Sequence, residues 1–183
     1  LPICLIRFSD CTPERIRVTI RSCRGTANIA NAGLFYAKPI ADNSEKLKLS
    51  DVDVKGWKIA NGNNAMQSAI DGDIKTVYRG EGLQALTVDM GKDVSVKGFC
   101  YAPAADDNLK GTIYKYEFYV SNDGNSWTKC EASNEFSNIM HNPIPYFVRF
   151  GKAYNARYFK LVPTAEINGQ QCTSIGEVGI LTK

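Results

Sequence analysis

The sequence contains a single histidine, His141, and its six cysteines follow no paired spacing. Zinc sites use His and Cys in closely spaced pairs, so a zinc-binding class is excluded. A chain of 183 residues can build a hydrophobic core without covalent cross-links. We therefore expect free and mostly buried thiols. The cysteines are Cys4, Cys11, Cys23, Cys100, Cys130 and Cys172.

Strong charge of one sign is also missing. The net charge is only +3, and no Lys/Arg-rich run occurs, which excludes a nucleic-acid-binding class. No apolar run approaches the roughly 20 residues that span a bilayer, so we expect no membrane partner. The chain begins with Leu1 and carries no signal-peptide pattern there. We expect that a leader or a preceding region has been removed, or that the chain is an excised piece.

Short alternating segments are what the sequence does contain. In residues 15–21, apolar and polar side chains alternate strictly, which predicts a half-buried strand. The same period occurs over 86–90 and 114–120, and an Asn-Asp-Gly-Asn turn follows at 122–125. Further candidate strands are 96–102, 146–150, 157–162 and 177–181. No window has a convincing helical period, so the pattern predicts an all-β sandwich or barrel.

The stretch SAIDGDIKT, residues 68–76, is the main acidic motif, with Asp71 and Asp73 on either side of Gly72. Glycine permits a tight turn that folds oxygens inward, and converging oxygens suit a hard cation such as calcium. A plain Asp-Gly turn is the alternative, and on these residues alone it is the commoner outcome.

Six segments between residues 54 and 183 together resemble one known module. They are Trp57, AIDGDIKT, LTVDMGKDVSVKGFCYAP, YEFYVSNDGNSW, ARYFKLV and IGEVGIL. The module is the factor V/VIII type C, or discoidin-like, domain, which includes family 32 of the carbohydrate-binding modules. The resemblance implies a galactose-binding-like jelly-roll β-sandwich. In bacteria such modules are usually non-catalytic, carbohydrate-binding appendages of secreted glycoside hydrolases.

The start of the chain extends this resemblance. Residues 1–38 look like the closing strands of the β-sandwich that follows the catalytic barrel in bacterial α-L-fucosidases. Residues 39–53 are polar and contain Pro39, which is typical of a linker. The expected organisation is therefore a fragment of a preceding module (1–38), a linker (39–53) and a jelly roll (54–183). The implied parent is a secreted, periplasmic or cell-surface bacterial fucosidase-like enzyme, whose catalytic domain is an expected partner. A β-hexosaminidase is the alternative parent.

The resemblance also implies a structural calcium ion that ties the first loop to the last strand. The residues that match its ligands are Ser68, Asp71, Asp73, Thr76, Gly176 and Glu177. Asp71 and Glu177 would supply carboxylates, Thr76 its oxygens, and the others backbone carbonyls. About seven oxygens at roughly 2.3–2.6 Å satisfy calcium. The alternative is a metal-free turn in which Asp71 and Glu177 are solvated.

The sugar-binding positions are where the sequence departs from the family pattern. Galactose-binding members use a histidine after the calcium turn and an arginine farther along. Here the loop reads VYRGEG, and Ala104 stands in place of the arginine. A tyrosine face can stack on a sugar ring, so this end can still contact a glycan containing galactose, fucose or N-acetylhexosamine. The predicted contacts are Tyr78, Arg79, Asp106 and Asn108. The alternative is that Tyr78 packs on the sandwich edge and the module only packs on the catalytic barrel.

We expect no catalysis by this chain itself. A retaining glycosidase needs two carboxylates about 5–5.5 Å apart in a cleft. Asp71 and Asp73 have a better use as calcium ligands, and the parent's nucleophile would lie in a barrel outside these residues.

Overall fold

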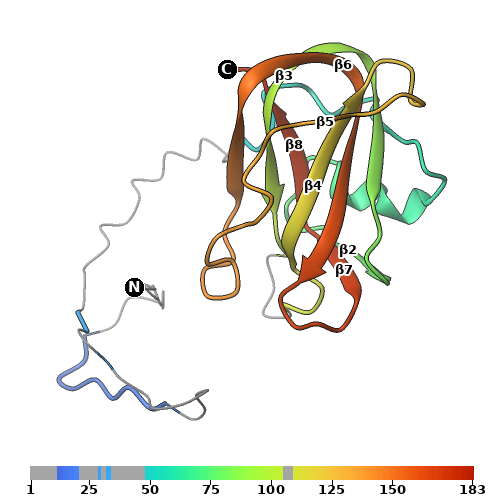
Figure 1. Cartoon of the computed structure of the whole chain (residues 1–183). Coiled ribbons are helices and arrows are strands. Elements are labelled where there is room, and N and C mark those ends of the chain that lie inside the picture. The colour runs from blue at the N-terminus through green and yellow to red at the C-terminus, as the bar shows by residue number, and fades with distance from the viewer. Residues whose placement is uncertain (1–11, 21–28, 30–31, 34–47, 105–108) are drawn as a thin grey trace. The chain divides into compact units, whose positions relative to one another are not determined.

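The structure is a computed structural model that describes residues 12–20, 29, 32–33, 48–104 and 109–183. Residues 48–183 lie in one compact unit and residues 12–20 in another, so each is considered by itself. The elements are β1 (Lys58–Ile59), the 3-10 helix η1 (Asn64–Ala69), β2 (Tyr78–Glu81), β3 (Leu86–Ala102), β4 (Ile113–Ser121), β5 (Thr128–Lys129), β6 (Tyr146–Glu166), β7 (Cys172–Ile175) and β8 (Glu177–Leu181) (Figure 1). Within the described ranges, no helix is long and apolar enough to cross a membrane.

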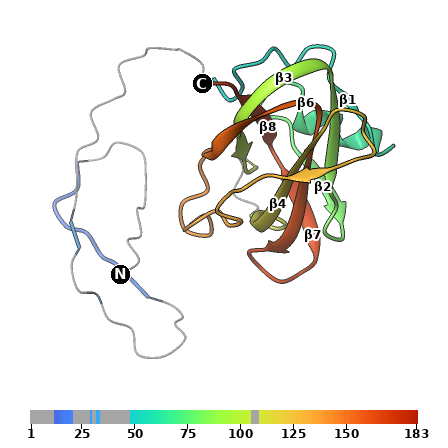
Figure 2. The same cartoon turned by 45° about the horizontal axis from the view of Figure 1, so that its top comes forward.

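Two long antiparallel strands, β3 and β6, organise the module. The larger sheet has the order β1-β3-β6-β4-β5, with β8 also paired to β3, while β2 and β7 form a separate two-stranded sheet. The β3–β6 register shifts between Asp89 and Val94 and again between Val96 and Gly98. Such irregularities bend strands, and the strands surround a common interior (Figure 2). The prediction of an all-β fold is confirmed.

Aromatic side chains fill the interior. In β4, Tyr116, Phe118 and Val120 are buried while the residues between them are partly exposed, as the period of two predicts. The Phe99 ring stacks on Phe118, with 4.2 Å between ring centroids. Cys100 is also buried, and burial raises the pKa of its thiol to about 12. Cys100, Cys130 and Cys172 are free thiols, as expected, while the other three cysteines lie outside the described residues.

The strand predictions were right in position but incomplete in length. Segments 86–90 and 96–102 form a single strand, β3, because its pairing with β6 resumes at Val94 after the irregularity that contains Gly91, which adopts a φ of +75°. Segments 146–150 and 157–162 likewise join into β6. The short strands β2 and β7 were missed. They pair with each other, Ser174 of β7 also bridges Thr112, and β2 falls in the stretch expected to be a loop.

The described jelly-roll unit begins at Lys48, six residues earlier than the predicted boundary. The Asp51 N–H donates to the Ile180 carbonyl at 2.8 Å, and the Ile180 N–H donates to Ser50 Oγ at 3.2 Å. Asp51 also accepts the Thr182 N–H at 2.8 Å, which lowers the pKa of its carboxyl. Residues 48–53 are therefore held against β8, where the sequence predicted a linker.

Substituting Gly179 with alanine is expected to destabilise the module by about 1–3 kcal/mol. A Cβ at this position would lie 2.1 Å from the Leu49 carbonyl oxygen, so the backbone of residues 49–51 has to move. Gly151→Ala is the matched control, because a Cβ there meets nothing within 4 Å. Urea unfolding of both variants measures the difference. Equal midpoints for the two variants would contradict the close packing of residues 48–53 on β8.

Residues 12–20 carry no strand, although 15–21 were predicted to form one. The side chains of Ile16, Val18 and Ile20 are 48%, 61% and 48% exposed. A strand requires a hydrogen-bonded neighbour, and its apolar face requires a cover. Within the described residues, nothing pairs with this segment. The rest of 1–38 and most of 39–53 lie outside the described residues, so the assignment of 1–38 to a preceding module stays a prediction.

Candidate functional site

The acidic turn after η1 is held by its own carboxylates. Gly72 adopts a φ of +83°, which an L side chain rarely tolerates. The Asp73 N–H donates to Asp71 Oδ1 at 2.8 Å, and the Lys75 N–H donates to Asp73 Oδ1 at 3.0 Å. One oxygen of the Asp71 carboxylate therefore holds the turn, and its other oxygen, Oδ2, faces the Thr76 hydroxyl.

Three acceptor oxygens of this turn converge on the Thr76 hydroxyl. Thr76 Oγ1 lies 2.8 Å from Asp71 Oδ2, 2.8 Å from the Asp73 carbonyl oxygen and 3.0 Å from the Ser68 carbonyl oxygen. A hydroxyl has one hydrogen, so it satisfies only one of the three at a time. The remaining lone pairs face one another, which is unfavourable unless a cation or water lies among them.

Glu177, at the start of β8, faces the same turn. Its side chain is buried, 2% exposed, and its Oε2 accepts the Gly72 N–H at 3.1 Å. Its Oε1 is buried without a hydrogen-bond partner among the described residues. Burial raises the pKa of this carboxyl to about 8, and the nearby Asp71 and Asp73 carboxylates add to the rise. A buried, half-satisfied carboxylate of this kind is strongly destabilising unless it is protonated or bound to a cation.

Gly176 precedes Glu177 and brings β8 close to the end of β3. Its N–H donates to the Ala102 carbonyl at 3.0 Å, and a Cβ at this position would lie 2.6 Å from the Pro103 carbonyl oxygen. No group of three or more His, Cys, Asp or Glu side chains is arranged for a metal within the described part of the chain. The predicted calcium ligands include only two carboxylates, those of Asp71 and Glu177. The other ligands are carbonyl and hydroxyl oxygens, which suit calcium. The residues present therefore fit the ion.

With calcium chelated, the module is expected to lose stability as the pH rises. The pKa of Glu177 is about 8 in the folded state against 4.5 for an unperturbed glutamate. The folded state therefore binds more protons than the unfolded state between these values, so stability is highest below the lower value. Above it, the free energy of unfolding falls by up to about 1.4 kcal/mol per pH unit, until the folded pKa is reached. Urea unfolding in chelator at several pH values measures the slope, and Glu177→Gln should flatten it. A profile that is equally steep in the variant would contradict this assignment.

At the predicted sugar-binding end, the structure does not offer Tyr78 as a stacking platform. The ring is buried, 5% exposed, because β2 pairs with β7 and turns the side chain inward. The hydroxyl accepts the Asn63 amide N–H at 3.0 Å and donates to Gln84 Oε1 at 2.8 Å. The prediction that Tyr78 contacts a sugar is therefore corrected: it packs on the sandwich edge. Ala104, at the expected arginine position, is buried as well.

The other predicted sugar contacts are divided between the surface and the undescribed loop. Arg79 is exposed at the edge strand β2. Asp106 and Asn108 lie outside the described residues. Leu83, in the loop after β2, is 37% exposed and follows Gly82, whose N–H donates to the Gln171 carbonyl at 2.7 Å.

Sequence reasoning missed the groups that hold this end together. The buried Glu166 accepts the N–H groups of Asn168, at 2.8 Å, and of Gln170, and so orders the turn before β7. Thr173 Oγ1 donates to the Gly82 carbonyl at 2.8 Å and accepts the Gln84 N–H at 2.8 Å. The role of Glu166 could have been predicted, because its carboxylate comes just before the Asn168-Gly169 turn. No local sequence pattern predicts the role of Thr173.

Several known proteins resemble this chain over its jelly-roll module. It is 30% identical over 137 residues to a galactose oxidase of Gibberella zeae, covering 66% of this chain and 18% of that enzyme. A family 32 carbohydrate-binding module of C. perfringens NanJ, solved in complex with galactose, is 27% identical with a TM-score of 0.54, covering 68% of this chain and 89% of the module. A putative α-L-fucosidase of Bacteroides ovatus is 30% identical with a TM-score of 0.51, covering 81% of this chain and 22% of that enzyme. The chain thus spans about a fifth of the two enzymes.

A family model also matches the module. The model of the F5/8 type C domain matches residues 50–178, which begins within the segment that the structure attaches to β8 and ends within β8 itself. Together with the similar solved modules, it confirms the galactose-binding-like sandwich. The chain therefore belongs to the F5/8 type C family.

Proposed function

We propose that the chain is a carbohydrate-binding accessory module of a glycoside hydrolase. The observation that carries this proposal is the family match over residues 50–178, joined to the likeness to a family 32 module that holds galactose. Lectin-type contacts are usually weak, so the module would act by raising the effective concentration of its parent enzyme at a glycan. Domains of this family are non-catalytic binding modules, so an aryl fucoside should not be turned over by this chain.

The glycan would lie on the loops at the Arg79 end of the sandwich. Arg79 supplies hydrogen-bond donors for hydroxyls, and Leu83, four residues farther along the chain, supplies an exposed apolar surface. The hydrogen bonds from Gly82 and Gln84 keep this loop in place, which reduces the entropy cost of binding. A galactose-, fucose- or N-acetylhexosamine-containing glycan fits this chemistry, with Asp106 and Asn108 as further proposed contacts.

The proposal includes a structural calcium ion at the acidic turn. Asp71 and Glu177 would hold it with carboxylates, Thr76 with its hydroxyl, and Ser68, Asp73 and Gly176 with backbone carbonyls. The three oxygens around Thr76 Oγ1 and the unpartnered Glu177 Oε1 support this assignment. The ion would neutralise the buried charge and link the turn to β8.

The proposed parent is a bacterial α-L-fucosidase-like enzyme, and its catalytic domain is the proposed partner within the same protein. The 30% identity to the Bacteroides ovatus protein supports this choice over a β-hexosaminidase. A glycan-directed enzyme of this kind would work outside the cytoplasm, so we propose a secreted, periplasmic or cell-surface location. Recovering the full-length protein from a cytoplasmic fraction alone would contradict the location.

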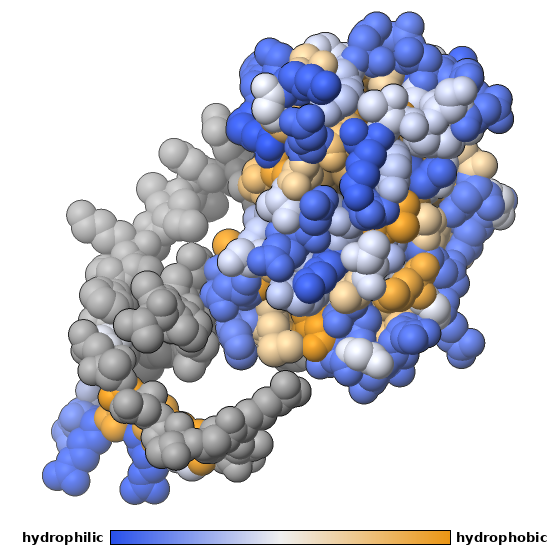
Figure 3. All heavy atoms as spheres, in the orientation of Figure 1, coloured by the Kyte–Doolittle hydropathy of each residue, from blue (hydrophilic) through white to orange (hydrophobic). Residues whose placement is uncertain are grey.

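A purely structural module is the second candidate, since Tyr78 is buried and Ala104 replaces the arginine. A module that packs permanently on a barrel needs a contiguous apolar patch. On the face seen in Figure 3, the described surface is mainly hydrophilic, with apolar residues scattered over it.

A glycan array followed by calorimetric titration separates the two candidates. Binding is expected to a galactose-, fucose- or N-acetylhexosamine-terminated glycan, weakened by about tenfold in Arg79→Ala. Lys97→Ala is the matched control, because Lys97 is an exposed cation on β3, outside the loop end. A folded module that binds nothing on the array would sink the binding proposal and favour the structural one.

A further inference from the structure

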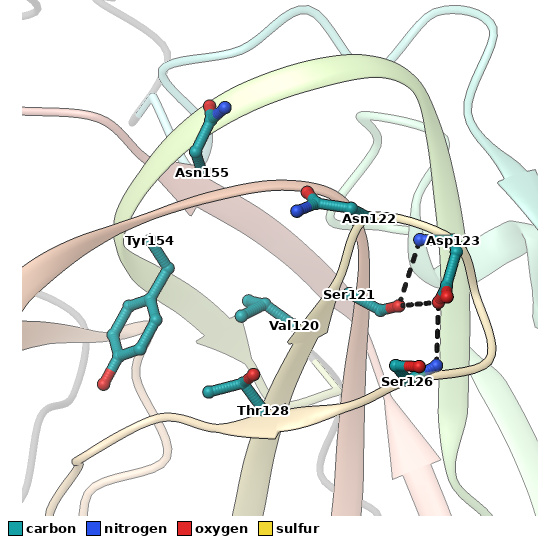
Figure 4. A pocket seen from close by; sticks show the side chains of 8 residues that line it. All are labelled: Val120, Ser121, Asn122, Asp123, Ser126, Thr128, Tyr154 and Asn155. Atoms are coloured by element: carbon teal, nitrogen blue, oxygen red, sulfur yellow. Dashed lines mark hydrogen bonds between the residues drawn. The ribbon is translucent and has the colours of Figure 1, made fainter.

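A pocket lies at the far end of β4 from the Arg79 loops. β4 pairs with β6 as far as Ser121 and Tyr158, whereas the preceding β6 residues 154–156 pair with β3. The two strands therefore part beyond Tyr158, and the turn of residues 122–127 spans the gap. The resulting β4–β6 pocket has a volume of about 330 Å³. It is lined by Val120, Ser121, Asn122, Asp123, Ser126, Thr128, Tyr154 and Asn155 (Figure 4).

One wall of the pocket is rigid. Asp123 Oδ1 accepts the N–H groups of Asn125 at 2.8 Å and Ser126 at 2.7 Å, and it also accepts the Ser121 hydroxyl at 3.0 Å. Ser121 Oγ in turn accepts the Gly124 N–H at 2.9 Å. These bonds lower the pKa of the Asp123 carboxyl to about 2, so it is ionised at neutral pH. The wall is preorganised, and its negative charge disfavours anionic ligands.

Two carboxamides at the pocket are not used by the protein. Figure 4 shows Asn122 reaching from the turn toward β6, with Asn155 above it and Thr128 below. Neither Asn122 nor Asn155 makes a side-chain hydrogen bond with the residues that the structure describes. Each amide offers two donors and an acceptor, which matches the mixed character of sugar hydroxyls.

The apolar part of the pocket is equally well fixed. The Tyr154 ring stands edge-on to Phe150, with 5.7 Å between centroids, and its hydroxyl accepts the Glu131 N–H at 3.3 Å. Val120 adds an aliphatic surface beside it. Val120 and Tyr154 are buried, whereas Asn122 and Asn155 are exposed. The volume of the pocket is at the lower end of the range for small-molecule sites. A monosaccharide-sized ligand suits it.

We propose that the β4–β6 pocket is a second carbohydrate site, which binds one neutral sugar residue through Asn122 and Asn155. It is distinct from the loop end, because β4, with nine residues, separates the two by about 30 Å. Two sites at opposite ends allow one module to contact two glycan chains. Multivalent attachment then strengthens binding to a dense glycan surface without a new contact at the first site.

An NMR titration of the ¹⁵N-labelled chain tests the second site. The probes are methyl β-galactoside, methyl α-L-fucoside and methyl N-acetyl-β-glucosaminide, each raised to about 100 mM, well above a millimolar dissociation constant. With at least one of them, the side-chain amide signals of Asn122 and Asn155 should shift and saturate. In the double variant Asn122→Ala/Asn155→Ala, followed by the backbone signals of Ser121 and Thr128, the dissociation constant should rise at least about tenfold.

Asn125→Ala is the matched control, because Asn125 belongs to the same turn but does not line the pocket. It should leave the titration unchanged, and Asn155→Ala alone should still weaken it if the double variant does not fold. Absence of saturable shifts at the pocket with all three sugars, or equal affinity in a folded pocket variant, would overturn the second site. The signals of Arg79 and Leu83 report the loop end separately, so shifts confined to them overturn only this inference.

Discussion

Replacing Glu177 with glutamine is expected to stabilise the module in chelator and to destabilise it in calcium. Without the ion, glutamine removes a buried carboxyl whose Oε1 has no partner among the described residues. With the ion, the same change removes one of only two carboxylate ligands. The wild type should gain about 2.7 kcal/mol when calcium is about 100-fold above its dissociation constant. The variant should lose most of that gain. It should therefore be more stable than the wild type in chelator and less stable than the wild type in calcium.

Thermal unfolding in calcium and in chelator measures this reversal. The wild-type melting temperature should rise with calcium by on the order of 5–10 °C. Asp53→Asn is the matched control, because Asp53 is exposed and, among the residues that the structure describes, accepts only the nearby Lys55 N–H, at 3.0 Å. It should respond to calcium as the wild type does. Identical wild-type melting in calcium and in chelator would refute the calcium proposal, and a calcium response that survives intact in Glu177→Gln would exclude that residue as a ligand.

Replacing Phe99 with alanine is expected to be the most destabilising single change in the interior. The residue is fully buried, and its ring meets Tyr116, Phe118 and Phe150 at centroid distances of 5.3, 4.2 and 6.1 Å. Removing the ring leaves a cavity among side chains that come from β4 and β6. Such changes cost about 3–5 kcal/mol, which is a large part of a total stability of about 5–15 kcal/mol.

Chemical unfolding of Phe99→Ala and of Phe147→Ala makes the comparison. Phe147 is also an aromatic residue in the larger sheet, but it is 44% exposed, so its loss should change the free energy of unfolding by less than about 1 kcal/mol. The denaturant dependence should be the same in all three proteins. Similar losses for both variants would show that the burial of Phe99 does not determine the cost of removing its ring.

The candidate metal site was largely visible in the sequence, and the sugar end was not. Asp71, Asp73 and Thr76 are local to one turn, so their spacing predicts their proximity. Glu177 was assigned to the same site only through the family pattern, and its carboxylate does accept the Gly72 N–H, at 3.1 Å. Tyr78 was assigned to the surface because β2 is too short to show a clear alternation of apolar and polar residues. Its pairing with β7 turned the ring inward.

The sequence by itself determined the β-class, the inward faces of long strands such as β4, and the acidic turn. These follow from period-two alternation and from glycine's conformational freedom, which are local properties. Only the tertiary structure decided the continuity of β3 and β6, the attachment of residues 48–53 to β8, and the burial of Glu177 and Tyr78. These depend on contacts between residues up to 131 positions apart. No local pattern encodes which distant strand will supply a hydrogen-bond partner or exclude water.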